Sequence, residues 1–84
     1  MKNKFILESL ASDLKRVAIG KQRGSNKMAG RFLLEAIKRK KEIDMKLVAT
    51  YIKNLLSKLN NNIDADDALM YSTLIQNYTR RLYL

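Results

Sequence analysis

Hydrophobic residues recur at three- and four-residue spacing along almost the whole chain, and this spacing is typical of an amphipathic α-helix. In the first segment, Leu7, Leu10, Leu14 and Val17 share one face, while charged and polar residues occupy the other. No proline interrupts the pattern anywhere. The sequence therefore predicts an all-α protein whose helices cover residues 3–19, 26–42, 45–59 and 65–82.

Helix-capping residues stand at the boundaries of these segments. Gly20 follows the last hydrophobic position of the first helix and is expected to end it. Ser25 or Asn26 can cap the second helix, and Asp44 and Asp64 can cap the third and the fourth. The isoleucine before each of these aspartates can pack against the turn that follows, as a hydrophobic staple. Because the three connections are short, consecutive helices are expected to be antiparallel neighbours in a compact four-helix arrangement.

The last two predicted helices each have a hydrophobic face that should contribute to the core. In the third helix this face consists of Val48, Tyr51, Ile52, Leu55 and Leu59. In the fourth helix it consists of Ala68, Tyr71, Ile75, Tyr78 and Leu82. The two tyrosines of the fourth helix could also stack on the bases of a single-stranded nucleic acid, but few cations lie near them in the sequence. We expect both to be core residues.

The length and composition are those of one small globular domain, which we expect to span residues 1–84. Hydrophobic residues make up 46% of the chain, enough for a single core. There is no cysteine, so disulfides cannot reinforce this core, and helix packing or homo-oligomerisation must supply the stability. Charged residues interrupt the hydrophobic start of the chain, and no run is long enough to span a membrane. We therefore expect a cytoplasmic protein without a membrane partner.

The chain lacks the residues on which most catalytic and metal sites depend. It has neither histidine nor cysteine, which excludes the commonest general base, the thiol nucleophile and the usual zinc ligands. The acidic cluster Asp64, Asp66 and Asp67 lacks the ligand pattern of a calcium loop, whereas acidic residues at the start of a helix interact favourably with its dipole. We expect no enzymatic activity, no metal and no cofactor.

The positive charge is concentrated in one part of the chain. The formal net charge is +9, and residues 15–41 contain ten cations and one anion, so this segment holds the whole of it. Residues 60–84, by contrast, carry two cations and three anions. An asymmetry of this kind indicates an acidic partner more strongly than an evenly basic composition does.

Four of these cations, Lys27, Arg31, Lys38 and Lys41, fall within a narrow arc of the second predicted helix, opposite its hydrophobic face. Fourteen residues separate the first from the last, which corresponds to about 21 Å along a helix. A row of this length can follow several phosphates of a nucleic-acid backbone. The alternative is that the row is the solvated face that any amphipathic helix presents to water.

The segment GKQRGSNK, just before this helix, adds further cations and small residues. The amides near a capped helix start attract anions, and here they would meet several lysine and arginine side chains. A solvated turn between two helices is the alternative. The candidate nucleic-acid and anion-binding residues are Lys21, Arg23, Ser25, Asn26, Lys27, Arg31, Lys38 and Lys41.

The sequence thus predicts a small non-enzymatic binding module that contacts a polyanion, with nucleic acid as the first candidate and without sequence readout. A second hypothesis is a homo-oligomeric adaptor whose basic face meets an acidic protein. It depends on four hydrophobic residues that point away from the hydrophobic faces of their helices and could form a partner interface. These are Leu34, Leu47, Leu69 and Tyr83.

Overall fold

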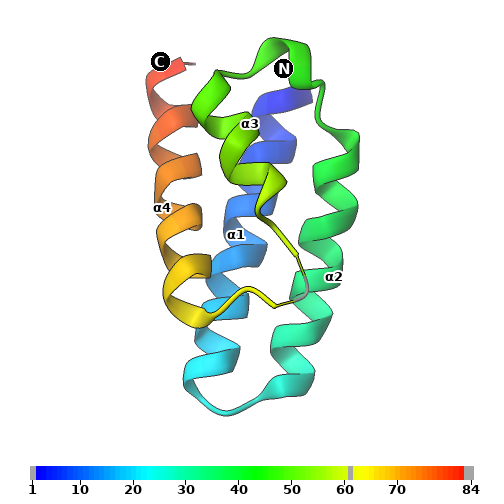
Figure 1. Cartoon of the computed structure of the whole chain (residues 1–84), viewed down its shortest axis with the longest axis vertical. Helices are drawn as coiled ribbons and strands as arrows, with labels where there is room; N and C mark the ends of the chain where they lie inside the picture. Colours follow the sequence, from blue (N-terminus) through cyan, green and yellow to red (C-terminus); the bar gives the residue numbers. More distant parts are fainter. Residues whose placement is uncertain (1, 61, 83–84) are drawn as a thin grey trace.

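Four α-helices and one 3₁₀ turn make up the computed structural model, which describes residues 2–60 and 62–82. The elements, in chain order, are α1 (Lys2–Gln22), α2 (Asn26–Glu42), the 3₁₀ turn η1 (Met45–Leu47), α3 (Thr50–Ser57) and α4 (Ala65–Leu82). Consecutive helices run in opposite directions along the long axis of the molecule (Figure 1). The prediction of a compact all-α arrangement with short antiparallel connections is confirmed.

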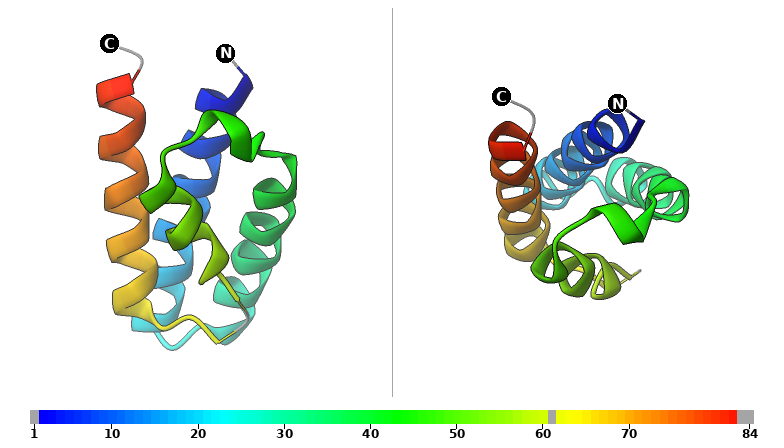
Figure 2. Two further views of the ribbon diagram at one scale, coloured as in Figure 1. Left: turned by 45° about the horizontal axis from the view of Figure 1, so that its top comes forward. Right: turned by 90° about the horizontal axis from the view of Figure 1, so that it is seen from above.

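Helix α1 is the central element of the fold. It lies between α2 and α4, and α3 lies across the core from it (Figure 2). Its hydrophobic face, predicted from the spacing of Leu7, Leu10, Leu14 and Val17, is completely buried. The other helices add the remaining core residues, among them Leu33, Ala36, Ile52, Leu56, Ala68 and Ile75.

The first helix does not end at Gly20, and that prediction is wrong. It continues to Gln22, and Gly24 takes the left-handed conformation, with φ of 76°, that terminates it. The Ser25 N–H donates a hydrogen bond to the Gly20 carbonyl (2.8 Å), and the Gly24 N–H donates one to the Lys21 carbonyl (3.2 Å), which together form a Schellman motif. Only glycine adopts this backbone conformation without strain, so Gly24 is the residue that stops α1.

Gly20 has a different role, because α1 and α2 approach each other closely there. A Cβ atom added at Gly20 would lie 2.9 Å from the backbone nitrogen of Ala29 in α2. Both residues are buried. The missing side chain at this position therefore permits the tight α1–α2 contact on which the arrangement of α2 depends.

The third helix is shorter than predicted. Asp44 does act as a cap, but of η1: its Oδ1 accepts a hydrogen bond from the Lys46 N–H (3.1 Å). Val48 and Ala49 are then extended, and α3 begins only at Thr50. The predicted continuous helix over residues 45–59 is wrong, because tertiary contacts override the local helical pattern.

Two side chains from distant helices hold this connection in place. The Asn3 side chain pairs with the Asp44 backbone: its Nδ2 donates to the Asp44 carbonyl and its Oδ1 accepts from the Asp44 N–H, both at 3.0 Å. The hydroxyl of Tyr78 accepts a hydrogen bond from the Ala49 N–H (3.0 Å). As a consequence the register of α3 changes: Tyr51, predicted in the core, is 53% exposed, and Leu56 is buried instead.

Helix α4 begins and packs as predicted. The Asp64 Oδ1 caps it by accepting a hydrogen bond from the Asp67 N–H (2.8 Å). Of the two predicted core tyrosines, Tyr78 is buried and Tyr71 is half-buried against the core. The Leu82 side chain, which the prediction also placed on this face, lies outside the described part of the chain.

Candidate functional site

The outer face of α2 carries the predicted row of cations. Lys27, Arg31, Lys38 and Lys41 are all exposed, and they lie opposite the buried face of α2 that contains Ala29, Leu33 and Ala36. We call these four cations the basic stripe. Helix geometry alone puts them together, since steps of three, four and seven residues return to the same side of a helix.

The charges of the basic stripe are not neutralised by neighbouring carboxylates. Within the described residues, none of its four cations has an acidic partner within 4.0 Å, and neither do Lys21 and Arg23 in the preceding segment. The one ion pair described for α2 is made by Arg39, on another side of the helix. The surface therefore presents an uncompensated positive potential to solvent.

Arg39, to which the sequence assigned no role, forms the shortest ion pair described. Its Nε donates a hydrogen bond to Oδ2 of Asp13 in α1 (2.7 Å), while Nη1 of Arg16 lies 3.9 Å from the other carboxylate oxygen. Asp13 is only 5% exposed. This buried carboxylate joins α2 to α1, beside the buried face of α2 that contains Ala29, Leu33 and Ala36.

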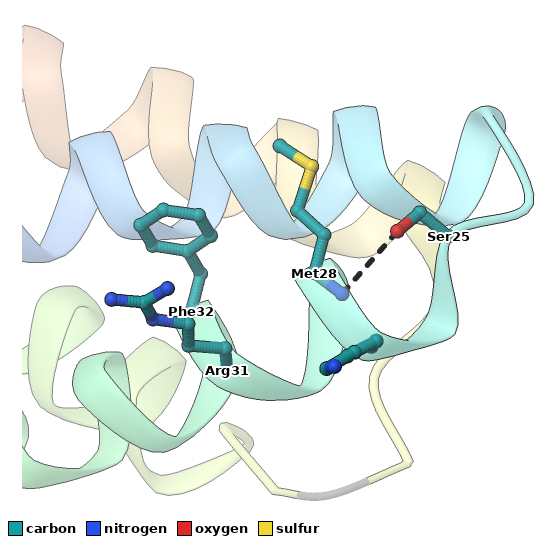
Figure 3. Close-up of a pocket in the computed structure, with 5 residues that line it drawn as sticks. Ser25, Met28, Arg31 and Phe32 are labelled. Atoms are coloured by element: carbon teal, nitrogen blue, oxygen red, sulfur yellow. Dashed lines mark hydrogen bonds between the residues drawn. The ribbon is translucent and has the colours of Figure 1, made fainter.

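The start of α2 adds capping geometry to the stripe. Ser25 is the N-cap, and its Oγ accepts a hydrogen bond from the Met28 N–H (3.3 Å; Figure 3). The Ser25 hydroxyl is thus engaged within the protein. In the described part of the chain, the amides of Asn26 and Lys27 make no hydrogen bond, and they remain available to an anion.

An open depression of about 260 Å³ lies beside this helix start, lined by Ser25, Lys27, Met28, Arg31 and Phe32. Figure 3 shows the Met28 side chain directed toward α1 and the Arg31 side chain on the same surface as Phe32. The guanidinium of Arg16, from α1, lies over the Phe32 ring at 5.2 Å from its centroid.

Phe32 and Arg16 are the members of this surface that the sequence analysis missed. Arg16 lies on α1 and Phe32 on α2. Their contact arises only when the two antiparallel helices pack together. No spacing within either helix could indicate it.

The predicted partner-interface residues are exposed but do not form one patch. Leu34 is 63% exposed in the middle of the basic stripe, Leu47 lies on η1, and Leu69 lies on α4. Helices α2 and α4 lie on opposite sides of α1 (Figure 2), so Leu34 and Leu69 are well separated. Tyr83 lies outside the described residues.

Other kinds of site are not indicated in the described ranges, residues 2–60 and 62–82. No group of three acidic side chains is arranged there to hold a metal ion. No helix in these ranges is both long enough and hydrophobic enough to cross a lipid bilayer.

Comparisons with protein-family models, curated proteins and solved structures give no significant match to this chain. The surface chemistry of the molecule is therefore what indicates its function. The most distinctive feature of that surface is the basic stripe with the helix start beside it.

Proposed function

We propose that the protein is a cytoplasmic, non-enzymatic binding module that holds nucleic acid on the basic stripe and on the segment before α2. The observation that carries this proposal is the alignment of four exposed cations along one helix, none of them paired with a carboxylate in the described structure. A row on one face suits a linear polyanion.

The length of the stripe favours a polymer over a small phosphate compound. The cations extend over about 21 Å, and a nucleic-acid strand presents one phosphate about every 3.4 Å, so the row is long enough to face about six phosphates of a strand. The depression at the start of α2 is open to solvent and lacks the enclosing walls of a small-molecule site.

Binding would be driven by the release of counterions as lysine and arginine side chains approach phosphates. The amides of Asn26 and Lys27, at the positive end of the α2 dipole, would hold one phosphate near the helix start. Such contacts position a protein on a backbone and carry no base information, so we expect no sequence preference. The phosphate contacts would come from Lys21, Arg23, Lys27, Arg31, Lys38 and Lys41.

The direct test is fluorescence anisotropy of labelled single- and double-stranded oligonucleotides, titrated with the protein between about 50 and 200 mM salt. We expect micromolar affinity at the low end of this range and a steep decrease with salt, equally for unrelated sequences. If no oligonucleotide binds even at the lowest salt, the proposal is wrong and the stripe is a solvated surface.

A homo-oligomeric adaptor for an acidic protein is the second candidate, and the exposure of Leu34 within the stripe favours it. A large hydrophobic side chain surrounded by cations suits a protein surface that combines carboxylates with a hydrophobic contact. Leu34→Glu should then abolish binding of that protein, and phosphate-rich polymers should compete poorly. On a nucleic-acid surface the same substitution should weaken binding only through its added negative charge.

A further inference from the structure

A second surface, on the other side of the molecule, has the features of a docking groove. It lies between α3 and α4, has a volume of about 310 Å³, and is lined by Tyr51, Leu74, Asn77, Tyr78 and Arg81. Helix α3 has eight residues and α4 has eighteen, so α3 is too short to pack along the whole of α4. The late start of α3 also places Tyr51 outside the core.

The walls of this groove are hydrophobic and exposed. Tyr51 stands edge-on to Tyr78, with ring centroids 5.8 Å apart and an interplanar angle of 89°, so its position is defined by an aromatic contact. Leu74 is 40% exposed on the opposite wall, and Met70, one turn earlier on α4, is also exposed. Tyr51 and Leu74 thus form a hydrophobic lining, and helical spacing places Met70 beyond Leu74 on the same side of α4.

We propose that this groove docks an amphipathic helix of a partner protein, with acidic residues in the first turn of that helix. Hydrophobic residues at i, i+3 or i+4, and i+7 of the partner would contact Tyr51, Leu74 and Met70, in the way that helices occupy hydrophobic grooves. The lining residues on α4 extend from Leu74 to Arg81, about two helical turns, so a docked helix can contact this surface through more than one side chain.

Charge complementarity selects the acidic partner. Arg81 is the one charged residue that lines the groove, it is exposed, and it has no acidic partner within the described residues. Helix α4 has an acidic first turn of its own, formed by Asp66 and Asp67, so the test below includes sedimentation velocity to distinguish a second copy of this chain from another protein.

The ends of the groove also set the direction of the docked helix. Arg81 lies near the C-terminus of α4, while Asp66 lies near its N-terminus, on the same side of the helix as Met70. The N-terminal turn of a helix carries a partial positive charge and prefers acidic residues. A partner helix antiparallel to α4 places its acidic first turn beside Arg81.

This inference is independent of the proposed nucleic-acid binding, since α2 and α4 lie on opposite sides of α1 (Figure 2). The probe is a labelled helix-forming peptide of about eighteen residues, the length of α4, with leucines at helical spacing and glutamates in its first turn. Its control has the same composition, with the glutamates moved to the last turn. Anisotropy at about 150 mM salt should show binding of the first peptide at about 1–100 μM and weaker binding of the control.

Two matched variants locate the binding site on the protein. Leu74→Gln should weaken binding of the peptide about tenfold or more. Leu69→Gln should leave it unchanged, because Leu69 is equally exposed (42%) but lies about 140° around α4 from Leu74, away from the groove. Arg81→Glu should weaken binding of the peptide with glutamates in its first turn and strengthen binding of a peptide with lysines there. Both leucine variants alter exposed positions, and far-ultraviolet circular dichroism verifies that each is folded.

Three results would overturn the proposal. In the first, Leu74→Gln and Leu69→Gln bind the peptide with the same affinity as the unaltered protein. In the second, binding is lost when Lys38 and Lys41 are neutralised but not when Leu74 is replaced, which would assign the peptide to the basic stripe. In the third, sedimentation velocity shows a dimer that Leu74→Gln dissociates, which would make a second copy of this chain the occupant.

Discussion

Asp13 and Arg39 join the two helices that carry the proposed binding surface: the Nε of Arg39 in α2 donates a 2.7 Å hydrogen bond to the nearly buried carboxylate of Asp13 in α1. A carboxylate removed from water is stabilised only when it is paired, and here it is paired with Arg39 and lies near Arg16. The pair therefore links the position of α2 to the inner face of α1.

Replacement of Asp13 by alanine should destabilise the fold by about 1.5–3 kcal/mol, the range for loss of a hydrogen bond to a charged group. Urea denaturation followed by circular dichroism measures this change. Glu42→Ala provides the control, because Glu42 is exposed and makes no ion pair within the described structure. Equal effects of the two substitutions would show that the Asp13–Arg39 pair contributes nothing to stability.

Substitution of Gly20 by alanine should also destabilise the protein, even though alanine is the better helix former. The new Cβ would lie 2.9 Å from the Ala29 nitrogen in the backbone of α2, and overpacking of this kind costs about 1–3 kcal/mol. Gly30→Ala should have the opposite effect on stability, because Gly30 is exposed within α2 and a Cβ there meets no atom within 4 Å. We expect it to stabilise the protein by about 0.5–1 kcal/mol. Thermal unfolding of both variants tests the contrast.

Gly20 and Gly24 show which features of the fold could be predicted from the sequence and which could not. The number and order of the helices and the caps at Ser25 and Asp64 depend on neighbours in the sequence, and they were predicted. The end of α1 was misplaced because two glycines compete for the same role, and only the approach of α2 assigns Gly20 to packing. Local patterns cannot contain this information.

The same distinction applies to α3 and to the candidate site. Before α3, the Asp44 backbone is held by Asn3 and the Ala49 N–H by Tyr78. Both side chains are distant in the sequence, so the local helical pattern there was misleading. The basic stripe could be predicted because a single helix creates it. The contact of Arg16 with Phe32 could not, because it needs two helices.

Asn3→Ala should loosen the connection between α2 and α3. The substitution removes both 3.0 Å hydrogen bonds to the Asp44 backbone, and we expect a loss of about 1–2 kcal/mol in unfolding free energy. Hydrogen exchange measured by NMR should show faster exchange of the Asp44 amide, with the amides in the middle of α1 less affected. If the Asp44 amide exchanges at its original rate, the Asn3 side chain does not hold this connection.

Tyr78→Phe should lower the free energy of unfolding by about 1 kcal/mol, because it leaves the Ala49 N–H without its acceptor while the hydrophobic contacts of the ring are kept. Tyr71→Phe is the matched control, since the Tyr71 hydroxyl makes no hydrogen bond to the described residues. The free energies of unfolding of the two variants, measured by guanidinium denaturation, should differ by about this amount. The same stability in both would mean that water replaces the phenol at Ala49.

The salt dependence of oligonucleotide binding should locate the nucleic-acid surface on α2. Arg31→Ala combined with Lys38→Ala removes two proposed phosphate contacts, so the slope of log affinity against log salt should flatten by about two units, each contact contributing about 0.9 on duplex DNA. The matched double variant, Lys53→Ala with Lys58→Ala, removes the same charge from exposed positions at and just after α3.

Because that second variant has the same net charge as the first, any effect of overall charge on association appears equally in both. We therefore expect it to keep a slope close to that of the unaltered protein, and circular dichroism should show that both variants retain their helical content. Equal flattening in both would mean that nucleic acid responds to the total charge of the molecule. An unchanged slope in the variant of Arg31 and Lys38 would show that the basic stripe is not part of the binding surface.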